Sequence, residues 1–286
     1  MKRLALIAAA TLAAGVLDAA APSPNDTAAA AIKALAAQPN YSWNATVDST
    51  GGFRPGPTTG KTEKDGYTSV TMTMRDSPLQ IILQGDKMVV KSPFATGWQT
   101  VAELTAAADN NADGPPNMGR FFARMVQNAK ATPTVQATNL LAGAANLTTA
   151  SDGSIGGNLT VAAVTGMLSF GPPPGGGPAP TIANPNGSVK VWVTNGVLSK
   201  YQYNLQGGID FNGNSFDINR TTTVVISDVG ATKVEVPDEA KQKINAPAPS
   251  PAAPTSTPAS PAPAVVAPPA ASSTPASAPP APAAGS

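Results

Sequence analysis

Apolar and polar residues alternate with a period of two along much of this chain, and this alternation restricts the possible folds more than any other feature. The first such segment places Tyr41, Trp43, Ala45 and Val47 on one side, with polar residues between them. Successive side chains of a β-strand point to opposite faces of its sheet. The pattern therefore predicts strands that each turn one apolar face toward a core.

Turn-forming residues join neighbouring segments of this kind. Residues 70–74 and 79–83 alternate in the same way, and Gly85-Asp86 then precedes a segment that carries Met88. Short turns between consecutive strands favour antiparallel pairing. The expected fold class is therefore mostly β (α+β), built around an antiparallel meander.

The last third of the chain has the strongest β pattern. Residues 189–205 hold two alternating segments around Asn195-Gly196, a pair that suits the two positive φ angles of a tight hairpin. A second Asn-Gly pair precedes a strand expected over residues 218–226, and residues 231–237 are expected to form a short final strand. The sheet should therefore resume near the end of the folded part.

Spacings of three and four residues between apolar side chains predict helices elsewhere. The first helix is expected over residues 26–38, with Asp26 or Thr27 as its cap and Pro39 as its end. Residues 170–187 read as a Pro/Gly loop. The other helices are expected over residues 119–129, 134–147, 161–168 (capped by Thr160) and 238–244.

The composition of the two ends sets the expected domain limits. Residues 1–21 have a basic start, an apolar run and a small-residue cleavage zone, as in a secretory signal peptide. Residues 246–286 contain only Pro, Ala, Ser, Thr, Val and Gly, a composition typical of a disordered, partly polyproline II tail. The tail is interpreted either as a spacer that contacts the cell wall or as a non-adaptive extension. We expect one β domain over residues 25–245, exported to the periplasm or the extracellular envelope.

The residue types that are missing restrict the function. The chain has no His and no Cys, only 12% charged residues and a net charge of +1. Without His, the commonest general base and metal ligand is absent, so we do not expect an enzyme or a cofactor. Without Cys, no lipid anchor can be attached, so a soluble protein is expected. No basic cluster indicates nucleic acid binding, and no later segment is long enough for a transmembrane helix.

One segment resembles the start of a calcium-binding loop. In DNNADG, the oxygen-bearing Asp109, Asn111 and Asp113 stand at alternate positions before Gly114. The position that requires a bidentate Glu is occupied by Arg120, which is a cation. We therefore expect a polar turn and no metal site.

The order of elements resembles the LolA/LppX group of envelope lipoprotein carriers. The segments that carry the resemblance are VKVWVTNGVLSKYQYNLQ, TTTVVISDVG and KVEVPDEAK, with TASDGSIGGNLTVAAVTGML similar to a hairpin and helix of the LppX branch. The resemblance implies a curled antiparallel sheet, or incomplete barrel, over a few helices, with a hydrophobic cavity for acyl chains. These carriers have no catalytic residues, so none are transferred to this chain.

Two functions remain open at this point. The first is an exported binding protein for an amphiphilic lipid or a lipoprotein acyl chain, without covalent chemistry. The second is a structural or interaction module of the envelope with a filled core. Aromatic residues and Met make adaptable apolar walls, so they are the cavity-lining candidates if the core is hollow, together with Val70, which stands at alternate positions with Met72 and Met74. These candidates are Trp43, Val70, Met72, Met74, Met88, Phe121, Phe122, Met125, Tyr201 and Tyr203.

Overall fold

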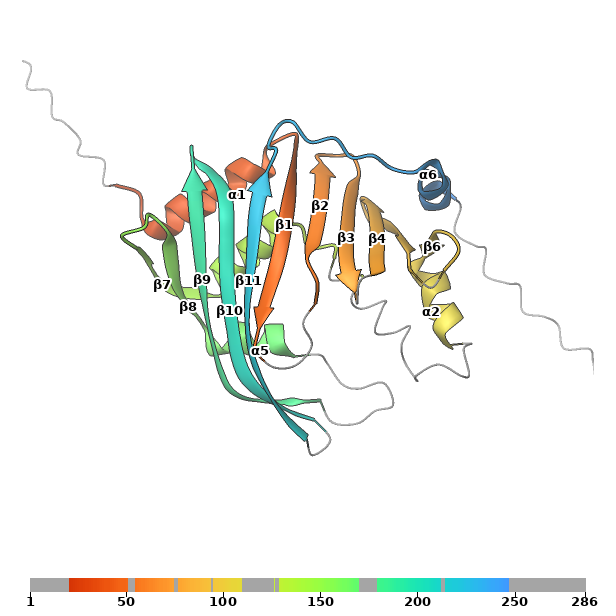
Figure 1. Ribbon diagram of the computed structural model, residues 1–286. Helices are drawn as coiled ribbons and strands as arrows, with labels where there is room; N and C mark the ends of the chain where they lie inside the picture. Colours follow the sequence, from red (N-terminus) through yellow and green to blue (C-terminus); the bar gives the residue numbers. More distant parts are fainter. Residues whose placement is uncertain are drawn as a thin grey trace, which may run out of the picture. The chain divides into compact units, whose positions relative to one another are not determined.

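The architecture is an open antiparallel sheet with helices packed on it (Figure 1). It is known from a computed structural model that describes residues 21–50, 55–74, 77–93, 95–109, 126, 129–169, 179–211 and 214–246. These residues belong to one compact unit, which ends at Ala246. The predicted tail beyond that residue, and the predicted signal peptide apart from residue 21, lie outside the described residues.

The sheet has eleven strands, in the order β6-β5-β4-β3-β2-β1-β11-β10-β9-β8-β7. Its first half consists of β1 (Asn40–Ser49), β2 (Thr58–Glu63), β3 (Thr68–Met74), β4 (Ser77–Gln84), β5 (Lys87–Lys91) and β6 (Gln99–Thr100). Its second half consists of β7 (Ala144–Thr149), β8 (Ile155–Leu159), β9 (Thr181–Thr194), β10 (Val197–Phe211) and β11 (Asn214–Ser227). The edge strands β6 and β7 do not pair with each other, so the sheet is not closed. The mostly β class and the incomplete barrel are confirmed.

The predicted hairpin turn between β9 and β10 is confirmed. Asn195 and Gly196 have φ angles of 53° and 76°, the left-handed conformation that a two-residue hairpin turn requires at both positions. Thr194 and Val197 pair on either side of the turn. The pairing register then places Val191 opposite Tyr201, so their side chains share one face of the sheet.

Five helices fall within the described residues: α1 (Pro24–Ala36), α2 (Val101–Asp109), α4 (Pro133–Ala142), α5 (Val161–Leu168) and α6 (Asp238–Asn245). The first begins earlier than expected, because its cap is the Ser23 hydroxyl, which accepts a hydrogen bond from the backbone N–H of Asp26. The cap expected for α5 is confirmed, since the Thr160 hydroxyl accepts from the N–H of Ala163.

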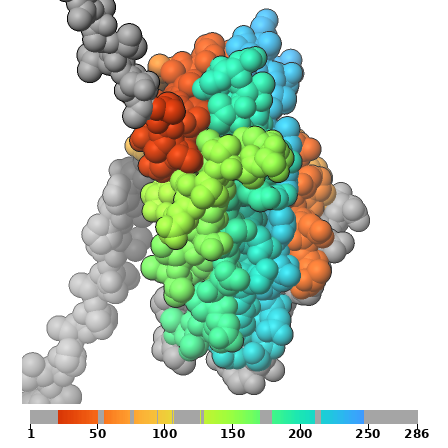
Figure 2. Space-filling view, turned by 90° about the vertical axis from the view of Figure 1, so that its left-hand side faces the viewer, coloured from red at the N-terminus to blue at the C-terminus, as the bar shows by residue number. Residues whose placement is uncertain are grey.

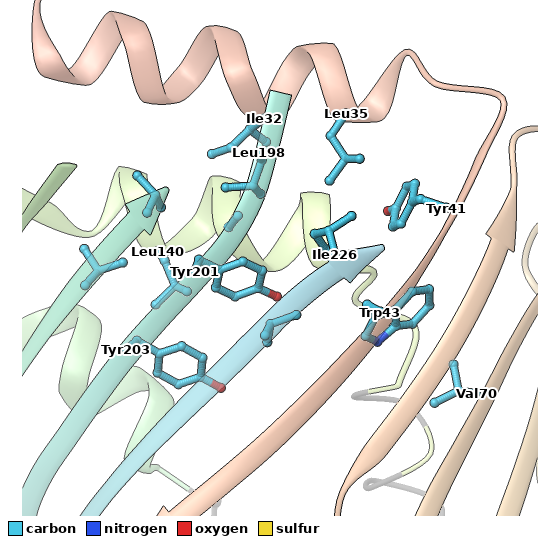
Figure 3. Close-up of a cluster of buried hydrophobic side chains, with 14 of the residues drawn as sticks. Ile32, Leu35, Tyr41, Trp43, Val70, Leu140, Leu198, Tyr201, Tyr203 and Ile226 are labelled. Carbon is cyan, nitrogen blue, oxygen red and sulfur yellow. The ribbon is translucent and has the colours of Figure 1, made fainter. Parts of the chain in front are cut away.

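One face of the sheet, here called the inner face, is covered by α1, α4 and α5, which contribute to the main core. Ile32 and Leu35 of α1 point toward Leu198 of β10 (Figure 3). At one edge, α1 contacts the β7–β8 hairpin, and the two lie side by side on the surface (Figure 2). The apolar side of the alternating segments thus faces these helices.

The opposite face is covered locally by α6. Ala240 and Ile244 of α6 pack with Ile82 of β4 and Val89 of β5 in a second apolar cluster. Because Leu79, Ile81 and Val90 are buried on the inner face, β4 and β5 are apolar on both sides there. This burial on two faces explains the consecutive apolar residues of these two strands.

Three predicted elements differ from the structure. Residues 144–147 continue as strand β7 rather than as helix, because α4 ends at Ala142 with Gly143 as its C-cap. The expected Pro/Gly loop overlaps β9, which already begins at Thr181. Residues 231–237 form no strand; they run past the ends of β1 to β4 and lead into α6 (Figure 1). The predicted helix over residues 119–129 lies almost entirely outside the described residues.

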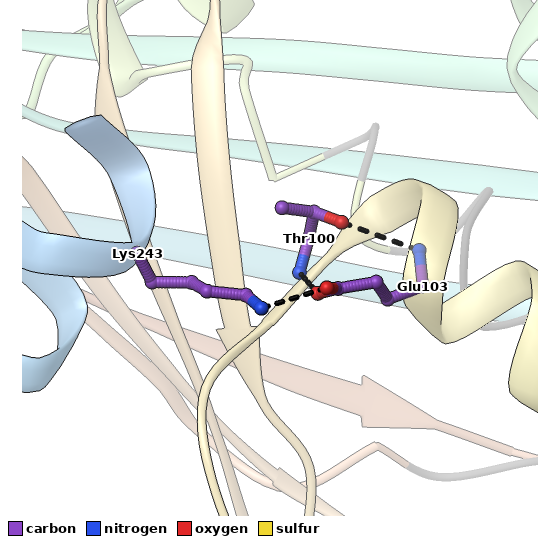
Figure 4. Close-up of polar contacts among 3 residues, drawn as sticks. All are labelled: Thr100, Glu103 and Lys243. Atoms are coloured by element: carbon purple, nitrogen blue, oxygen red, sulfur yellow. Dashed lines mark hydrogen bonds and ion pairs between the residues drawn. The ribbon is translucent and has the colours of Figure 1, made fainter. Parts of the chain in front are cut away.

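A capping box begins α2 and links it to α6 (Figure 4). The backbone N–H of Thr100 donates to the Glu103 carboxylate at 2.8 Å, and the N–H of Glu103 donates to the Thr100 hydroxyl at 3.2 Å. Lys243 of α6 forms an ion pair with Glu103, with 2.7 Å between Nζ and Oε1. The ammonium of Lys243, and next the N–H of Thr100, lower the pKa of Glu103 below its usual value.

Replacing Glu103 should have a small, pH-dependent effect on stability. Glu103→Gln keeps a capping oxygen but removes the charge, so at pH 7 it should lower the free energy of unfolding by at most about 1 kcal/mol, since solvent screens this exposed pair. A carboxylate with a lowered pKa stabilises the fold above 4.5, its usual value, and loses that effect as the pH falls through the lowered pKa. Denaturant unfolding of both proteins at pH 7 and well below pH 4 tests this. A difference that persists unchanged in acid would contradict it.

Candidate functional site

One row of residues crosses the middle of the inner face. Tyr201 of β10 pairs with Val224 of β11, which pairs with Ala45 of β1. Ala45 pairs with Thr58 of β2, and Thr58 with Met72 of β3. Residues paired in this way project from the same face. Because the centre of the row is made of small side chains and its ends of large ones, the row is hollow in the middle.

A cavity of about 330 Å³, here called the inner cavity, lies over this row. Ligand pockets in proteins measure roughly 300–1,000 Å³, so the inner cavity is at the small end of that range. It is lined by Trp43, Ala45, Val47, Pro55, Gly56, Thr58, Val70, Met72, Ala129, Ala131, Pro133, Gln136, Tyr201, Tyr203, Arg220, Thr222 and Val224. Most of these side chains are apolar, and they come from the sheet, from the residues just before β2, and from α4 with the residues just before it.

The aromatic residues of the cavity stand at its margins. The rings of Tyr201 and Tyr203 extend from β10 across the sheet toward Trp43 of β1 (Figure 3). All three are buried, with exposed fractions of 1%, 8% and 7%. Tyr41 adds a tilted ring contact to Trp43, with 5.9 Å between the ring centroids. This aromatic packing holds the walls in place around the hollow centre.

Gly60 of β2 determines the position of the Trp43 side chain. The two residues are paired across β1 and β2, and a Cβ on Gly60 would overlap the six-membered ring of the indole. The ring therefore lies directly over the backbone of Gly60. Any larger residue at this position would displace the ring from the sheet.

The side-chain amide of Gln136, which belongs to α4, bridges Tyr201 and Tyr203 of β10. The Tyr201 hydroxyl donates to Oε1 of Gln136 at 2.6 Å, and Nε2 of Gln136 donates to the Tyr203 hydroxyl at 3.4 Å. Burial raises the pKa of Tyr201 above its usual value, with smaller contributions from Tyr203 and Tyr41. The phenol therefore stays protonated and donates. These polar atoms satisfy one another, so they add little penalty to an apolar site.

The structure places half of the cavity-lining candidates around the inner cavity: Trp43, Val70, Met72, Tyr201 and Tyr203. Met88 is buried in the same core but does not line the cavity. Phe121, Phe122, Met125 and the side chain of Met74 lie outside the described residues. That the lining residues bind a ligand stays a prediction.

Sequence reasoning did not single out Gln136, Arg220 and Thr222, which also line the cavity. Thr222 and Arg220 continue the alternation that carries Val224, so the period of two contained a signal for them. Gln136 has no comparable signal, because its position depends on how α4 packs against the sheet.

Elsewhere in the described residues, fewer side chains that could bind a ligand or a metal ion come together. A depression of about 420 Å³ between the start of α1 and the α4–β7 junction is lined by small and polar residues with Leu141 and Leu147, and by no aromatic residue. Within the described residues, no group of three or more acidic side chains is placed to hold a metal ion. Asp109 ends α2, and the rest of DNNADG lies outside the described residues.

Among the described residues, no helix combines the length and the apolar character needed to cross a lipid bilayer. No family model matches the chain, and no curated protein matches it. Among solved structures, it is similar to LprF from Mycobacterium bovis, with 13% identity over 77% of this chain and 98% of that chain, and a TM-score of 0.38. The likeness to this solved structure is weak.

Proposed function

We propose that this chain is an exported binding protein of the cell envelope, periplasmic or extracellular, that holds a lipid or a lipoprotein acyl chain without covalent chemistry. The observation that supports the proposal is the inner cavity, a hollow in the main core where a structural module would have filled space. Its walls carry buried aromatic and aliphatic side chains (Figure 3), and the polar side chains of Gln136, Tyr201 and Tyr203 hydrogen-bond to one another.

The size of the inner cavity favours one acyl chain over several. An apolar cavity of about 150 Å³ holds one benzene molecule, and the inner cavity has about 330 Å³. Each methylene group removed from water gains about 0.8 kcal/mol. A single chain could therefore bind well through apolar contact alone, as expected for a site with no His or Cys.

A charge placed on the cavity wall should abolish binding and leave the fold intact. Met72 is only partly buried and lines the cavity, so the carboxylate of Met72→Asp can stay hydrated there. Leu79 is the matched control, because it pairs with Met72 across β3 and β4 but is fully buried and does not line the cavity. Leu79→Asp should unfold the domain, with a loss of several kcal/mol.

The measurement combines thermal unfolding with titration of a fluorescent fatty-acid probe. We expect saturable binding by the wild type, a folded Met72→Asp variant that does not bind, and an unfolded Leu79→Asp variant. A wild-type protein without saturable binding, together with a Met72→Asp variant that unfolds like the control, would favour the structural module with a filled core.

Filling the space beneath Trp43 should also impair binding. In Gly60→Ala, the new methyl group displaces the indole, so the variant should lose about 1–3 kcal/mol of stability and bind the probe more weakly. Gly166→Ala is the control, because a Cβ there meets nothing within 4 Å and lies inside α5. The control should be more stable than the wild type by about 0.5–1 kcal/mol, with unchanged binding. Equal probe affinity in all three proteins would argue against the inner cavity as the binding site.

A further inference from the structure

Among the described residues that line the inner cavity, Arg220 is the one cation. It projects from β11 on the same face as Thr222 and Val224. Its side chain is partly buried, and its Nε is shielded from solvent without a hydrogen-bond partner. It is the only buried side-chain nitrogen or oxygen of the described residues that lacks a partner.

The described residues that pair with Arg220 across the sheet do not neutralise its charge. Across the sheet it pairs with Ser49 of β1 and Leu205 of β10, neither of which is acidic. The ion pairs between described residues involve lysines of α6, and none of them includes Arg220. A shielded guanidinium N–H without an acceptor costs free energy, and more than a neutral donor would. An acceptor supplied from outside the chain would offset this cost.

A guanidinium is suited to one kind of acceptor in particular. Its N–H donors form a planar fork that matches the oxygens of a carboxylate or a phosphate. In an apolar cavity, the natural source of such an anion is the head of an amphiphile whose chain occupies the rest of the space. The inner cavity has this polarity, since Arg220 stands at one end and Trp43 at the other.

The pairing register shows that these two ends are well separated. Trp43 pairs with Ile226 on β11, and Arg220 lies six residues away on that strand. At about 3.3 Å per residue, the two ends of the cavity are roughly 20 Å apart. Val70 and Met72 lie nearer to the Trp43 end, and Tyr203 and Thr222 lie between. An extended chain can therefore run along the apolar wall with its head at Arg220.

We propose that Arg220 binds the anionic head of a single-chain amphiphile, a carboxylate or a phosphate monoester, in the inner cavity. This inference rests on the proposed function and defines its ligand class. The head group completes the hydrogen bonds of Nε, while Trp43, Val70 and Met72 contact the chain. Neutral lipids of the same length are bound through the chain alone and therefore less tightly.

The test compares ligands that differ only in the head: dodecanoate, dodecyl phosphate and dodecanol. The wild type should bind at least one of the two anions about 10- to 100-fold more tightly than the alcohol. Arg220→Gln should lose this preference while its affinity for dodecanol stays the same, and Arg220→Lys should keep part of it. Lys200→Gln is the control, because Lys200 lies over the Trp192 ring and does not line the cavity.

Each outcome decides a separate question. Preference for dodecanoate over dodecyl phosphate assigns a carboxylate ligand, and the reverse assigns a lipid phosphate; inorganic phosphate alone should not compete. Equal wild-type affinity for all three ligands would overturn the role of Arg220 and leave the lipid-binding function standing. No binding of any ligand would overturn both. The head-group comparison on the wild type remains decisive even if Arg220→Gln fails to fold.

Discussion

Eight successive residue pairs join β1 to β11, from Ser42–Ser227 to Ser49–Arg220, although the two strands come from opposite ends of the folded unit. The pairing is closed at one end by the Ser42 hydroxyl, which donates to the Asp228 carboxylate at 2.6 Å and lies 2.8 Å from the Ser227 hydroxyl. Without this junction the strands would form two separate meanders, each with an unpaired edge. The wall of the inner cavity exists only because the junction brings the two halves into register.

The inner cavity forms because the paired strands place small side chains at its centre and large ones at its ends. Ala45, Thr58 and Gly60 are small and stand near the β1–β2 boundary, whereas Tyr201 and Tyr203 reach in from β10. Protein cores normally close such space, because each unfilled volume costs contacts. Here the Gln136 bridge fixes the tyrosine hydroxyls in place, so the rings do not collapse into the gap. Under the proposed function, this volume is the space that the chain of the ligand occupies.

The sequence allowed the strands and their faces to be predicted, because the alternation of apolar and polar residues is visible within each short segment. It did not show that a strand can continue through a proline, a residue that normally ends one. In β9, Asn184 and Pro185 together oppose one residue of β10, and Asn184 has a φ of 49°, so a bulge accommodates the proline that indicated a loop. Residues 231–237 alternate like a strand, but they follow β11, which already pairs with β1 on one side and with β10 on the other, so no edge is free beside it. Positions such as that of Gln136 depend on helix packing, which no local pattern encodes.

The polar side chains of the inner cavity differ in whether they find their hydrogen-bond partners within the chain. Tyr201, Tyr203 and Gln136 hydrogen-bond to one another within the chain, and none of their buried polar atoms lacks a partner. Arg220 is not complete, since its Nε has no partner. A charged donor is harder to leave unpaired in a shielded place than a neutral one, so an acceptor from a bound ligand would relieve that cost. The tyrosine–glutamine group therefore accounts for the shape of the cavity, and Arg220 accounts for the polarity of the molecule that fits it.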